Sequence, residues 1–303
     1  MIRHSKLAII IILNINKKDE VLECLERVYR LNYPNFEVIV VDNGSTDGSV
    51  EAISRAFPNT RLLKHPYNAG VAGGRNLGID YADRHFSYDY LYFLDNDTTV
   101  EKESLLELTK MIGNDDQIGI GTPKSYRTSQ PGVIASAGGI SINLYTGSIL
   151  DIGAGEIDRG QFEQPKFVHS CAGFAFLVKK EVFRRVGFFD DDFNPYGWED
   201  VDFSIRVRKG GFKILYVPSA LVHHKGGRFG RGRALPEYEL HKVTNFFKLM
   251  GRHTNPVQRV CFWCSTPLRA VYFAIKGLCR GDGRVIIAQC RGLFRNSSGR
   301  DKR

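Results

Sequence analysis

The chain has 303 residues, of which 43% are hydrophobic and 25% are charged. These ordinary globular values exclude a disordered, collagen-like or coiled-coil chain, and the length allows two domains or one large α/β domain. The net charge of +9 is unevenly distributed, because residues 1–255 carry only +1 and residues 256–303 carry +8. This distribution excludes a uniformly basic nucleic-acid-binding protein.

The first 110 residues alternate between predicted strands and helices. Apolar runs predict strands at 7–13, 37–41, 61–64 and 90–94, and helical spacing predicts helices near 18–30, 48–57 and 70–83. This alternation predicts a mostly parallel, twisted, Rossmann-like sheet with right-handed crossovers and helices on both faces. In such sheets ligands bind at the carboxyl ends of the strands. No run of 18 apolar residues occurs, so we expect no transmembrane helix.

The second half of the chain is less regular. Glycine and serine are frequent over residues 124–165, which predicts an insertion that carries a hairpin. Beyond it we expect strands at 173–178, 214–217 and 220–222, and helices at 179–186, 198–209 and 237–250. Residues from 256 onward have helical apolar spacing.

Two carboxylates follow the predicted strand at 90–94. Asp95 and Asp97 flank Asn96 and can point into one cleft at the strand end. Carboxylate oxygens are ligands that Mg²⁺ and Mn²⁺ accept, usually together with substrate phosphates. The alternative is an ordinary solvated acidic loop.

A second acidic group opens the predicted helix at 198–209. Trp198 precedes Glu199 and Asp200, and a buried carboxylate in such a position can act as a general base. The alternative is a capping role, since acids in a first helical turn are stabilised by the helix dipole.

A histidine pair and a basic loop follow the last predicted strand. His223 and His224 precede residues 225–233, where Arg228, Arg231 and Arg233 alternate with glycine. Arginine on a glycine-rich loop suits binding of a diphosphate. The alternative is an RNA-binding patch.

Together, these segments resemble glycosyltransferase family 2, the inverting nucleotide-sugar transferases with a GT-A fold. The similarity runs from about residue 7 to residue 225, with a looser match beyond. Residues 42–45 and 68–74 look like those of the bacterial rhamnosyltransferase-like branch. The matching segments are 40–49, 68–76, 93–97, 171–174, 198–202 and 218–224.

The resemblance implies a role for each matching residue. Asp200 would be the general base, and Trp198 and Glu199 would shape the acceptor side. Asp97, His224 and Asp95 would hold Mn²⁺ or Mg²⁺ on the diphosphate of a dTDP- or UDP-sugar. The nucleotide-sugar site would comprise Asn14, Asp42, Asn43, Asn68, Gly70, Arg75, Asp95 and Asn96.

The chain would then divide into a transferase domain, residues 1–250, and a basic amphipathic tail, residues 256–303. Aromatic and aliphatic residues interleaved with basic ones are typical of a helix lying on an anionic membrane. We therefore expect a cytoplasmic enzyme, peripheral on the inner face of the cell membrane, that glycosylates a glycan or a lipid-linked acceptor. Packing of the tail on the catalytic domain is the alternative.

Two other function classes stay open. The chain could be a non-catalytic sugar-nucleotide-binding or scaffold protein of the same fold. It could also bind RNA through the Gly/Arg loop and the tail, although the nearly neutral body leads us to expect no nucleic-acid partner.

Overall fold

The computed structural model describes residues 6–226 and 236–279, without the side chains of 236–239 and 269–279. The arginines predicted for the basic loop, Arg228, Arg231 and Arg233, and residues 280–303 lie outside the described residues. The chain forms two compact units. Unit 1 comprises Met1–Ser141, Asp151–Asn194 and Glu199–Gly227, and unit 2 comprises Ile142–Leu150, Pro195–Trp198 and Arg228–Arg303.

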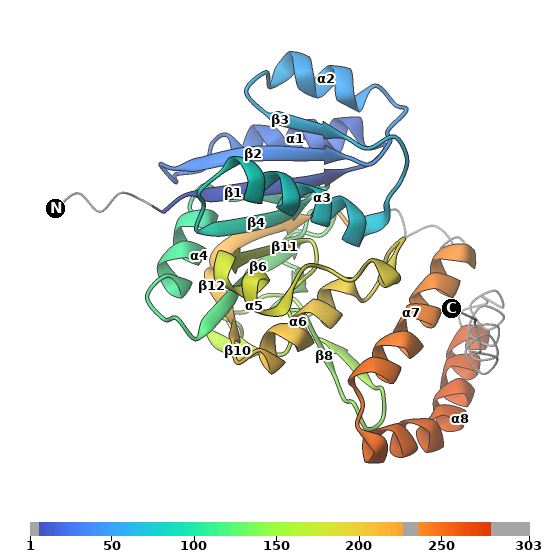
Figure 1. Cartoon of the computed structure of the whole chain (residues 1–303). Helices are drawn as coiled ribbons and strands as arrows, with labels where there is room; N and C mark the ends of the chain where they lie inside the picture. The colour runs from blue at the N-terminus through green and yellow to red at the C-terminus, as the bar shows by residue number, and fades with distance from the viewer. Residues whose placement is uncertain (1–5, 227–235, 280–303) are drawn as a thin grey trace. The chain divides into compact units, whose positions relative to one another are not determined.

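Unit 1 is built on one twisted sheet with the strand order β10-β12-β6-β11-β4-β1-β2-β3 (Figure 1). Strands β4, β1, β2 and β3 pair parallel with one another in that order, and β6 pairs parallel with β12. Strand β11 is antiparallel to both β4 and β6. The predicted fold class is therefore confirmed. The strands are β1 Ala8–Asn14, β2 Phe36–Asp42, β3 Arg61–Lys64, β4 Tyr90–Asp95, β5 Thr98–Val100, β6 Ile118–Arg127, β7 Ile134–Ser136, β10 Lys166–Val168, β11 Ala175–Lys179 and β12 Lys213–His224.

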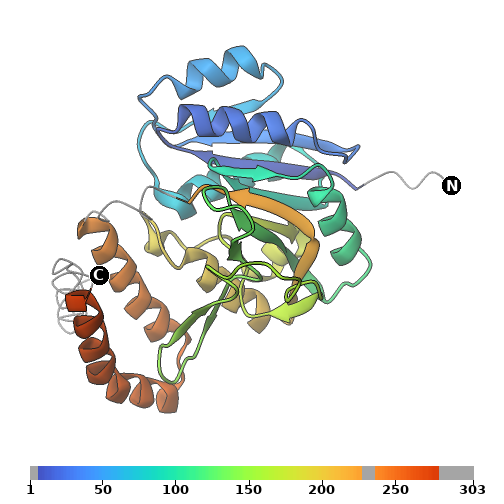
Figure 2. The same cartoon turned by 180° about the vertical axis from the view of Figure 1, so that it is seen from behind.

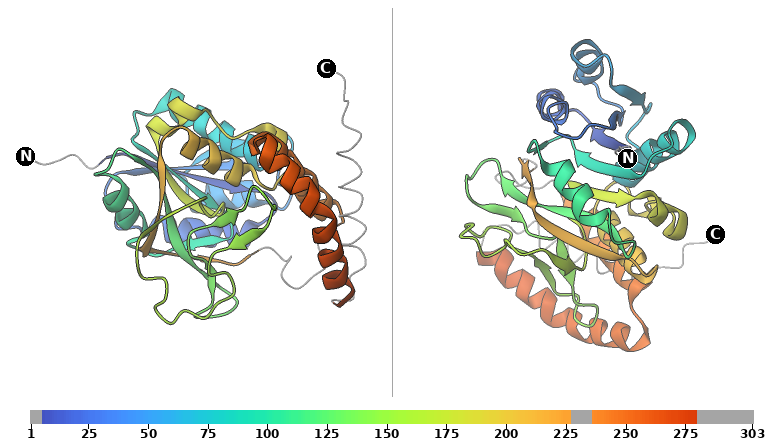
Figure 3. Two further views of the ribbon diagram at one scale, coloured as in Figure 1. Left: turned by 90° about the horizontal axis from the view of Figure 1, so that it is seen from below. Right: turned by 90° about the vertical axis from the view of Figure 1, so that its left-hand side faces the viewer.

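Helices cover both faces of this sheet, as the two opposite views in Figures 1 and 2 show. Successive side chains of a strand point to opposite faces, so Ile10 packs with α1, α2 and α4 while Ile9 packs with α3, α5 and α6. The sheet lies edge-on between these two layers in the right-hand view of Figure 3. The helices are α1 Lys18–Val28, α2 Ser49–Ala56, α3 Gly70–His85, α4 Ser104–Ile112, α5 Lys180–Val186 and α6 Glu199–Lys209.

The structure differs from the prediction at β12 and β6. The two strands expected at 214–217 and 220–222 form the single strand β12, whose register on β6 shifts between Val217 and Leu221. Pro218 lies within that shift, and a proline has no N–H to donate to a sheet. β6 was not predicted because buried Gly, Thr and Lys residues replace the usual apolar run, and Gly121 packs against Leu108 and Ile112 of α4.

Unit 2 contains α7 Pro236–His253, α8 Pro256–Cys279 and the tip of the hairpin formed by β8 Ile140–Ile142 and β9 Ile149–Asp151. Its apolar core is formed by Phe246, Met250 and Phe262, against which Ile142 and Leu144 pack. The helix predicted at 237–250, the helical structure of the tail over residues 256–279 and a hairpin within residues 124–165 are confirmed. Within residues 6–226 and 236–279, no helix combines the length and the apolarity that crossing a membrane requires.

Candidate functional site

Three polar side chains interlock at the carboxyl ends of β1, β2 and β4. The Asn14 amide donates to Asp42 Oδ1 at 3.0 Å and accepts from Asn96 Nδ2 at 2.8 Å. Asp42 Oδ2 also accepts from the backbone N–H of Ser45 at 2.9 Å. All three side chains are buried, and a buried polar group without a partner would be costly. This network therefore fixes the orientation of Asp42 at the sheet edge.

The glycine-rich segment that enters α3 packs closely on this edge. Asn43 Nδ2 donates to the Gly70 carbonyl at 2.9 Å and to Asn68 Oδ1 at 3.3 Å, and Asn68 Oδ1 also accepts from Gly70 N–H. Asn43 Oδ1 is buried and has no partner in the described residues. A side chain at Gly74 would overlap Leu13 of β1. The close approach of α3 to β1 therefore explains the glycine at position 74.

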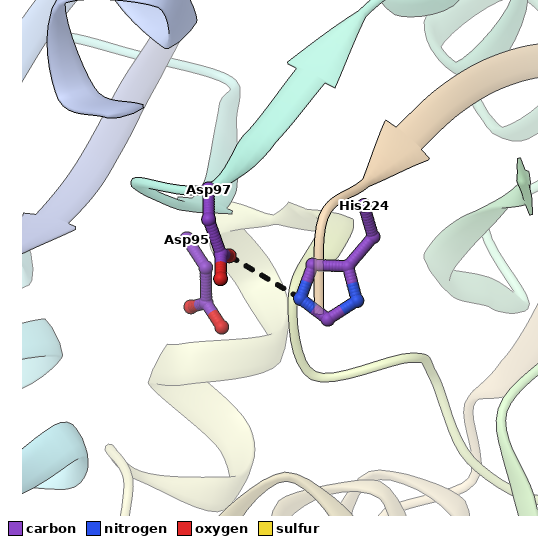
Figure 4. A group of neighbouring side chains, drawn as sticks. All are labelled: Asp95, Asp97 and His224. Atoms are coloured by element: carbon purple, nitrogen blue, oxygen red, sulfur yellow. Dashed lines mark ion pairs between the residues drawn. The ribbon is translucent and has the colours of Figure 1, made fainter. Parts of the chain in front are cut away.

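The carboxylates of Asp95 and Asp97 and the imidazole of His224 point toward one another (Figure 4). One ligand atom from each lies within 4.8 Å of the others, and His224 Nε2 is 3.2 Å from Asp97 Oδ1. His224 meets Asp97 because β5 follows Asp97 directly and pairs antiparallel with β12, with His224 opposite Thr98. Phe174 stacks on the His224 ring at 4.1 Å between centroids. Two carboxylates and an imidazole fit Mn²⁺ or Mg²⁺, with harder Mg²⁺ preferring the oxygens.

Asp97 is strongly held as a carboxylate. Its second oxygen, Oδ2, accepts from Lys17 Nζ at 2.8 Å. Burial alone would raise the pKa of Asp97, but the hydrogen bonds and charges of His224 and Lys17 outweigh it and hold the pKa well below its ordinary value. Burial and the neighbouring Asp97 raise the pKa of Asp95, although Arg75 opposes that effect. The two carboxylates therefore have opposite pKa shifts.

Arg75 connects the metal-side carboxylate to the acidic start of α6. Its guanidinium lies 3.2 Å from Asp95 Oδ1 and 3.3 Å from Glu199 Oε1, and donates to the Gly173 carbonyl at 2.6 Å. Only 3% of the Arg75 side chain is exposed. Burial would lower its pKa, but Asp95 and Glu199 raise it above the ordinary value. The guanidinium thus contacts carboxylates of the protein on two sides.

Asp200 lies against the backbone at Gly173. A Cβ atom at position 173 would overlap the Asp200 carboxylate, so this close approach requires glycine. Asp200 Oδ1 also accepts from Val201 N–H at 2.9 Å. Burial raises the pKa of Asp200, while the charge of Arg75 lowers it less strongly. The arrangement provides a partly buried carboxylate with an elevated pKa, which suits proton abstraction.

Trp198 belongs to unit 2, unlike the other predicted site residues. Its indole N–H donates to the Lys242 carbonyl at 2.8 Å, and its ring lies 5.2 Å from that of Phe246. Its backbone φ is +75°, a value uncommon for residues other than glycine. Glu199 is buried in unit 1 and bonded to Arg75.

Sequence reasoning missed two contributors to this site. Lys17 lies just beyond the first predicted strand, and its contact with Asp97 spans 80 residues. Gly173 lay in a matching segment, but its Asp200 contact depends on tertiary packing. For Lys17, the available signal was a lysine directly after the polar end of a strand. For Gly173, the sequence offers no signal of the Asp200 contact beyond the glycine itself.

The sequence profile of Glycosyl transferase family 2 matches residues 9–187, more than half of the chain. The chain belongs to glycosyltransferase family 2. It is thus a glycosyltransferase, and the predicted resemblance to this family is confirmed. A poly-β-1,6-N-acetyl-D-glucosamine synthase of Staphylococcus aureus (strain MSSA476) is 28% identical over 208 residues, covering 68% of this chain and 47% of that protein. The Staphylococcus epidermidis protein of the same name is 26% identical over the same shares of both chains. The matched part thus spans about half the length of these relatives.

Three solved structures have a fold similar to that of this chain. GalNAc-T7 with UDP, GalNAc and Mn²⁺ has a TM-score of 0.63 at 16% identity, covering 82% of this chain and 48% of that one. The mannosyltransferase PcManGT of Pyrobaculum calidifontis, in complex with GDP-Man and Mn²⁺, has a TM-score of 0.59 at 16% identity, covering 99% and 77%. S. aureus TarS 1–349 has a TM-score of 0.55 at 15% identity, covering 90% and 74%. At these identities the likeness shows the fold.

Proposed function

We propose that this glycosyltransferase is a metal-dependent, inverting hexosyltransferase. It moves a sugar from a nucleoside-diphosphate sugar to a hydroxyl of a glycan or lipid-linked acceptor in cell-envelope polysaccharide synthesis. The observation that carries the proposal is the convergence of Asp95, Asp97 and His224 at the carboxyl edge of the sheet. The Mn²⁺ and nucleotides named for the similar structures, and the polysaccharide synthases among the relatives, support it.

The donor would lie along the strand ends. Asp42, held by Asn14 and Ser45, would hydrogen-bond the base, and Asn43, Asn68 and Gly70 would line the same side. Asp95 and Asn96 would lie near the ribose or the sugar. We expect the donor to be a dTDP- or UDP-sugar. Arg75, which contacts Asp95, would contribute to this pocket by orienting the Asp95 carboxylate.

Mn²⁺ or Mg²⁺ held by Asp97, His224 and Asp95 would supply positive charge that stabilises the leaving diphosphate. Asp200 would remove the proton from the acceptor hydroxyl as its oxygen attacks the anomeric carbon from the face opposite the leaving group. One displacement of this kind inverts the configuration at that carbon. The raised pKa of Asp200 strengthens it as a base. Glu199 and Trp198, which precede it, would shape the acceptor side.

The tail would bring the enzyme to its acceptor. On α8, Val257, Val260 and Leu268 are 66%, 64% and 77% exposed, and their spacing places them on one side of a helix. We call these three residues the α8 stripe. An exposed apolar stripe on a segment with a net charge of +8, residues 256–303, fits an anionic membrane surface. We therefore assign catalysis to residues 1–250, membrane binding to residues 256–303, and the enzyme to the cytoplasmic face of the cell membrane.

Thermal unfolding with candidate donors tests this function. UDP-, dTDP- and GDP-sugars are each added with Mn²⁺, with Mg²⁺ or with EDTA. A donor at 100 times its dissociation constant should stabilise the fold by about 2.7 kcal/mol, and only when the metal is present. If none of these donors raises the melting temperature with either metal, the proposal is refuted.

A further inference from the structure

Lys17 follows a turn that contains one residue in the left-handed conformation. β1 ends at Asn14, and Asn16 then adopts a backbone φ of +46°, a left-handed conformation that asparagine tolerates better than most residues. Two hydrogen bonds hold this turn on the loop after β2. Asn16 N–H donates to Ser45 Oγ at 3.0 Å, and Asn16 Oδ1 accepts from Thr46 N–H at 2.8 Å. The turn fixes the direction in which Lys17 leaves the sheet edge.

Both oxygens of the Asp97 carboxylate have cationic or imidazole partners. His224 lies at Oδ1, 3.2 Å away, and Lys17 Nζ lies at Oδ2, 2.8 Å away. The two partners differ in mobility, since the His224 ring is stacked on Phe174 whereas Lys17 reaches Asp97 with a flexible four-carbon side chain that is 33% exposed. Lys17 Nζ thus places an ammonium charge on one oxygen of Asp97, opposite the His224 imidazole on the other.

A divalent cation on Asp97 and an ammonium group on the same carboxylate repel each other at close range. The ion would therefore displace Lys17 Nζ from Oδ2. Under the proposed function, the donor diphosphate would bind next to the ion and offer Lys17 a new anionic partner. Lysine is a common phosphate ligand. Its three rotatable donors allow it to move between the two partners without a change of backbone.

The other described cations near Asp97 are less suited to this exchange. Arg75 is buried and already contacts Asp95, Glu199 and the Gly173 carbonyl. Lys225 follows His224, but its ammonium pairs with Glu23 at 2.5 Å. Lys225 N–H donates to the Asp97 carbonyl at 3.0 Å, but among these three cations Lys17 alone contacts the Asp97 carboxylate with its side chain.

We propose that Lys17 is an exchanging diphosphate ligand, which neutralises Asp97 in the free enzyme and binds the donor diphosphate once the metal ion occupies Asp97. This assignment rests on the proposed metal-dependent function. It predicts two changes of opposite sign when the ammonium is removed. Metal ions alone should bind more tightly, because they no longer compete with Lys17, and nucleoside diphosphates should bind more weakly.

The test uses the full-length protein and its Lys17→Met variant. Mn²⁺ binding without nucleotide is followed by electron paramagnetic resonance, and UDP, dTDP and GDP binding at saturating Mn²⁺ by calorimetry. We expect Lys17→Met to bind Mn²⁺ several-fold more tightly and the preferred nucleotide about tenfold more weakly. Lys17→Arg keeps the charge and should bind that nucleotide within a few-fold of wild type. If Lys17→Met does not fold, the arginine variant still tests whether the charge at this position is sufficient.

Lys18→Met is the matched control. Lys18 is the exposed neighbour of Lys17, and this substitution removes the same charge. It should change neither affinity by more than twofold. Weaker Mn²⁺ binding by Lys17→Met, or unchanged nucleotide binding, would overturn the role of Lys17 while leaving the proposed function in place. If the wild type binds nucleotide with the same affinity with and without Mn²⁺, the proposed function is overturned and this assignment with it.

Discussion

The carboxyl edge of the sheet in unit 1 buries polar side chains, whereas α8 in unit 2 exposes apolar ones. At the sheet edge Asn14, Asp42 and Asn96 are almost inaccessible to solvent and hydrogen-bonded to one another. On α8 the three residues of the α8 stripe are mostly exposed. Hydrogen bonds offset the cost of burying polar groups at the edge, whereas the exposed residues of the α8 stripe forgo the stabilisation that burial would give. The contrast agrees with the two proposals made above, catalysis at the edge and membrane binding through the stripe.

The largest effect is expected from Asp200→Asn, which removes the proposed base and keeps the side chain's shape. Loss of a general base reduces turnover by roughly 10²- to 10⁴-fold. Transfer should fall by that factor in a radiolabelled-sugar assay, while metal-dependent donor binding stays within a few-fold of wild type. Equal loss of both would show that Asp200 supports the donor site instead.

Gly173→Ala tests whether packing at the edge sets the position of that base. The added methyl group would overlap the Asp200 carboxylate and displace it, and a displacement of about 1 Å can cost roughly 10²-fold in rate. Turnover should fall by about that factor with little change in donor affinity. Gly48→Ala is less suitable as a control, since Gly48 has a φ of +81°. Gly251→Ala is suitable, because a Cβ atom there meets nothing within 4 Å.

Arg75→Met should destabilise unit 1, because it leaves Glu199 buried without this ion pair and removes the partner of Asp95. Breaking a buried pair on one side costs about 3 kcal/mol, as measured by chemical denaturation. Arg84→Met removes an exposed pair with Asp80 and should change the free energy of unfolding by less than about 0.5 kcal/mol. Equal effects of the two substitutions would contradict the structural role of Arg75.

The pH dependence of transfer should reflect the environment of Asp200. Burial raises its pKa, and a base works only when deprotonated. As the pH falls, the rate should therefore begin to drop at a higher pH than for a solvent-exposed aspartate. A pH–rate profile measures this limb, and its absence in the wild type, or its presence unchanged in Asp200→Asn, would contradict the assignment.

The smallest effect concerns the α8 stripe. Burying one leucine side chain is worth about 1.5–3 kcal/mol, so Leu268→Asn should weaken binding to anionic vesicles by about tenfold or more. Vesicle co-sedimentation measures it, and catalysis on a soluble acceptor should be unaffected. If wild type and variant sediment equally with anionic and neutral vesicles, the tail does not recognise a membrane as proposed.

The two regions were also predictable to different degrees. Asp42 and Asp95 could be placed at one edge because parallel strands carry their carboxyl ends to the same side. The spacing of apolar residues and the turn residues between them were sufficient to predict α7 and the strands up to residue 94. β6 could not be predicted, since its buried Lys124 and Gly121 break the apolar pattern. The contacts of Arg75 with Asp95 and Glu199 join distant parts of the chain, which no local pattern encodes.

The proposed function requires Asp97 to hold a metal ion that binds a donor diphosphate. Calorimetric titration of UDP, dTDP and GDP into wild type and Asp97→Asn, with Mn²⁺ and with EDTA, measures this requirement. We predict that one nucleotide binds the wild type only with Mn²⁺, and that Asp97→Asn lowers that affinity by at least tenfold. Binding that is equal with Mn²⁺ and EDTA, or equal in the two proteins, would contradict the proposed function.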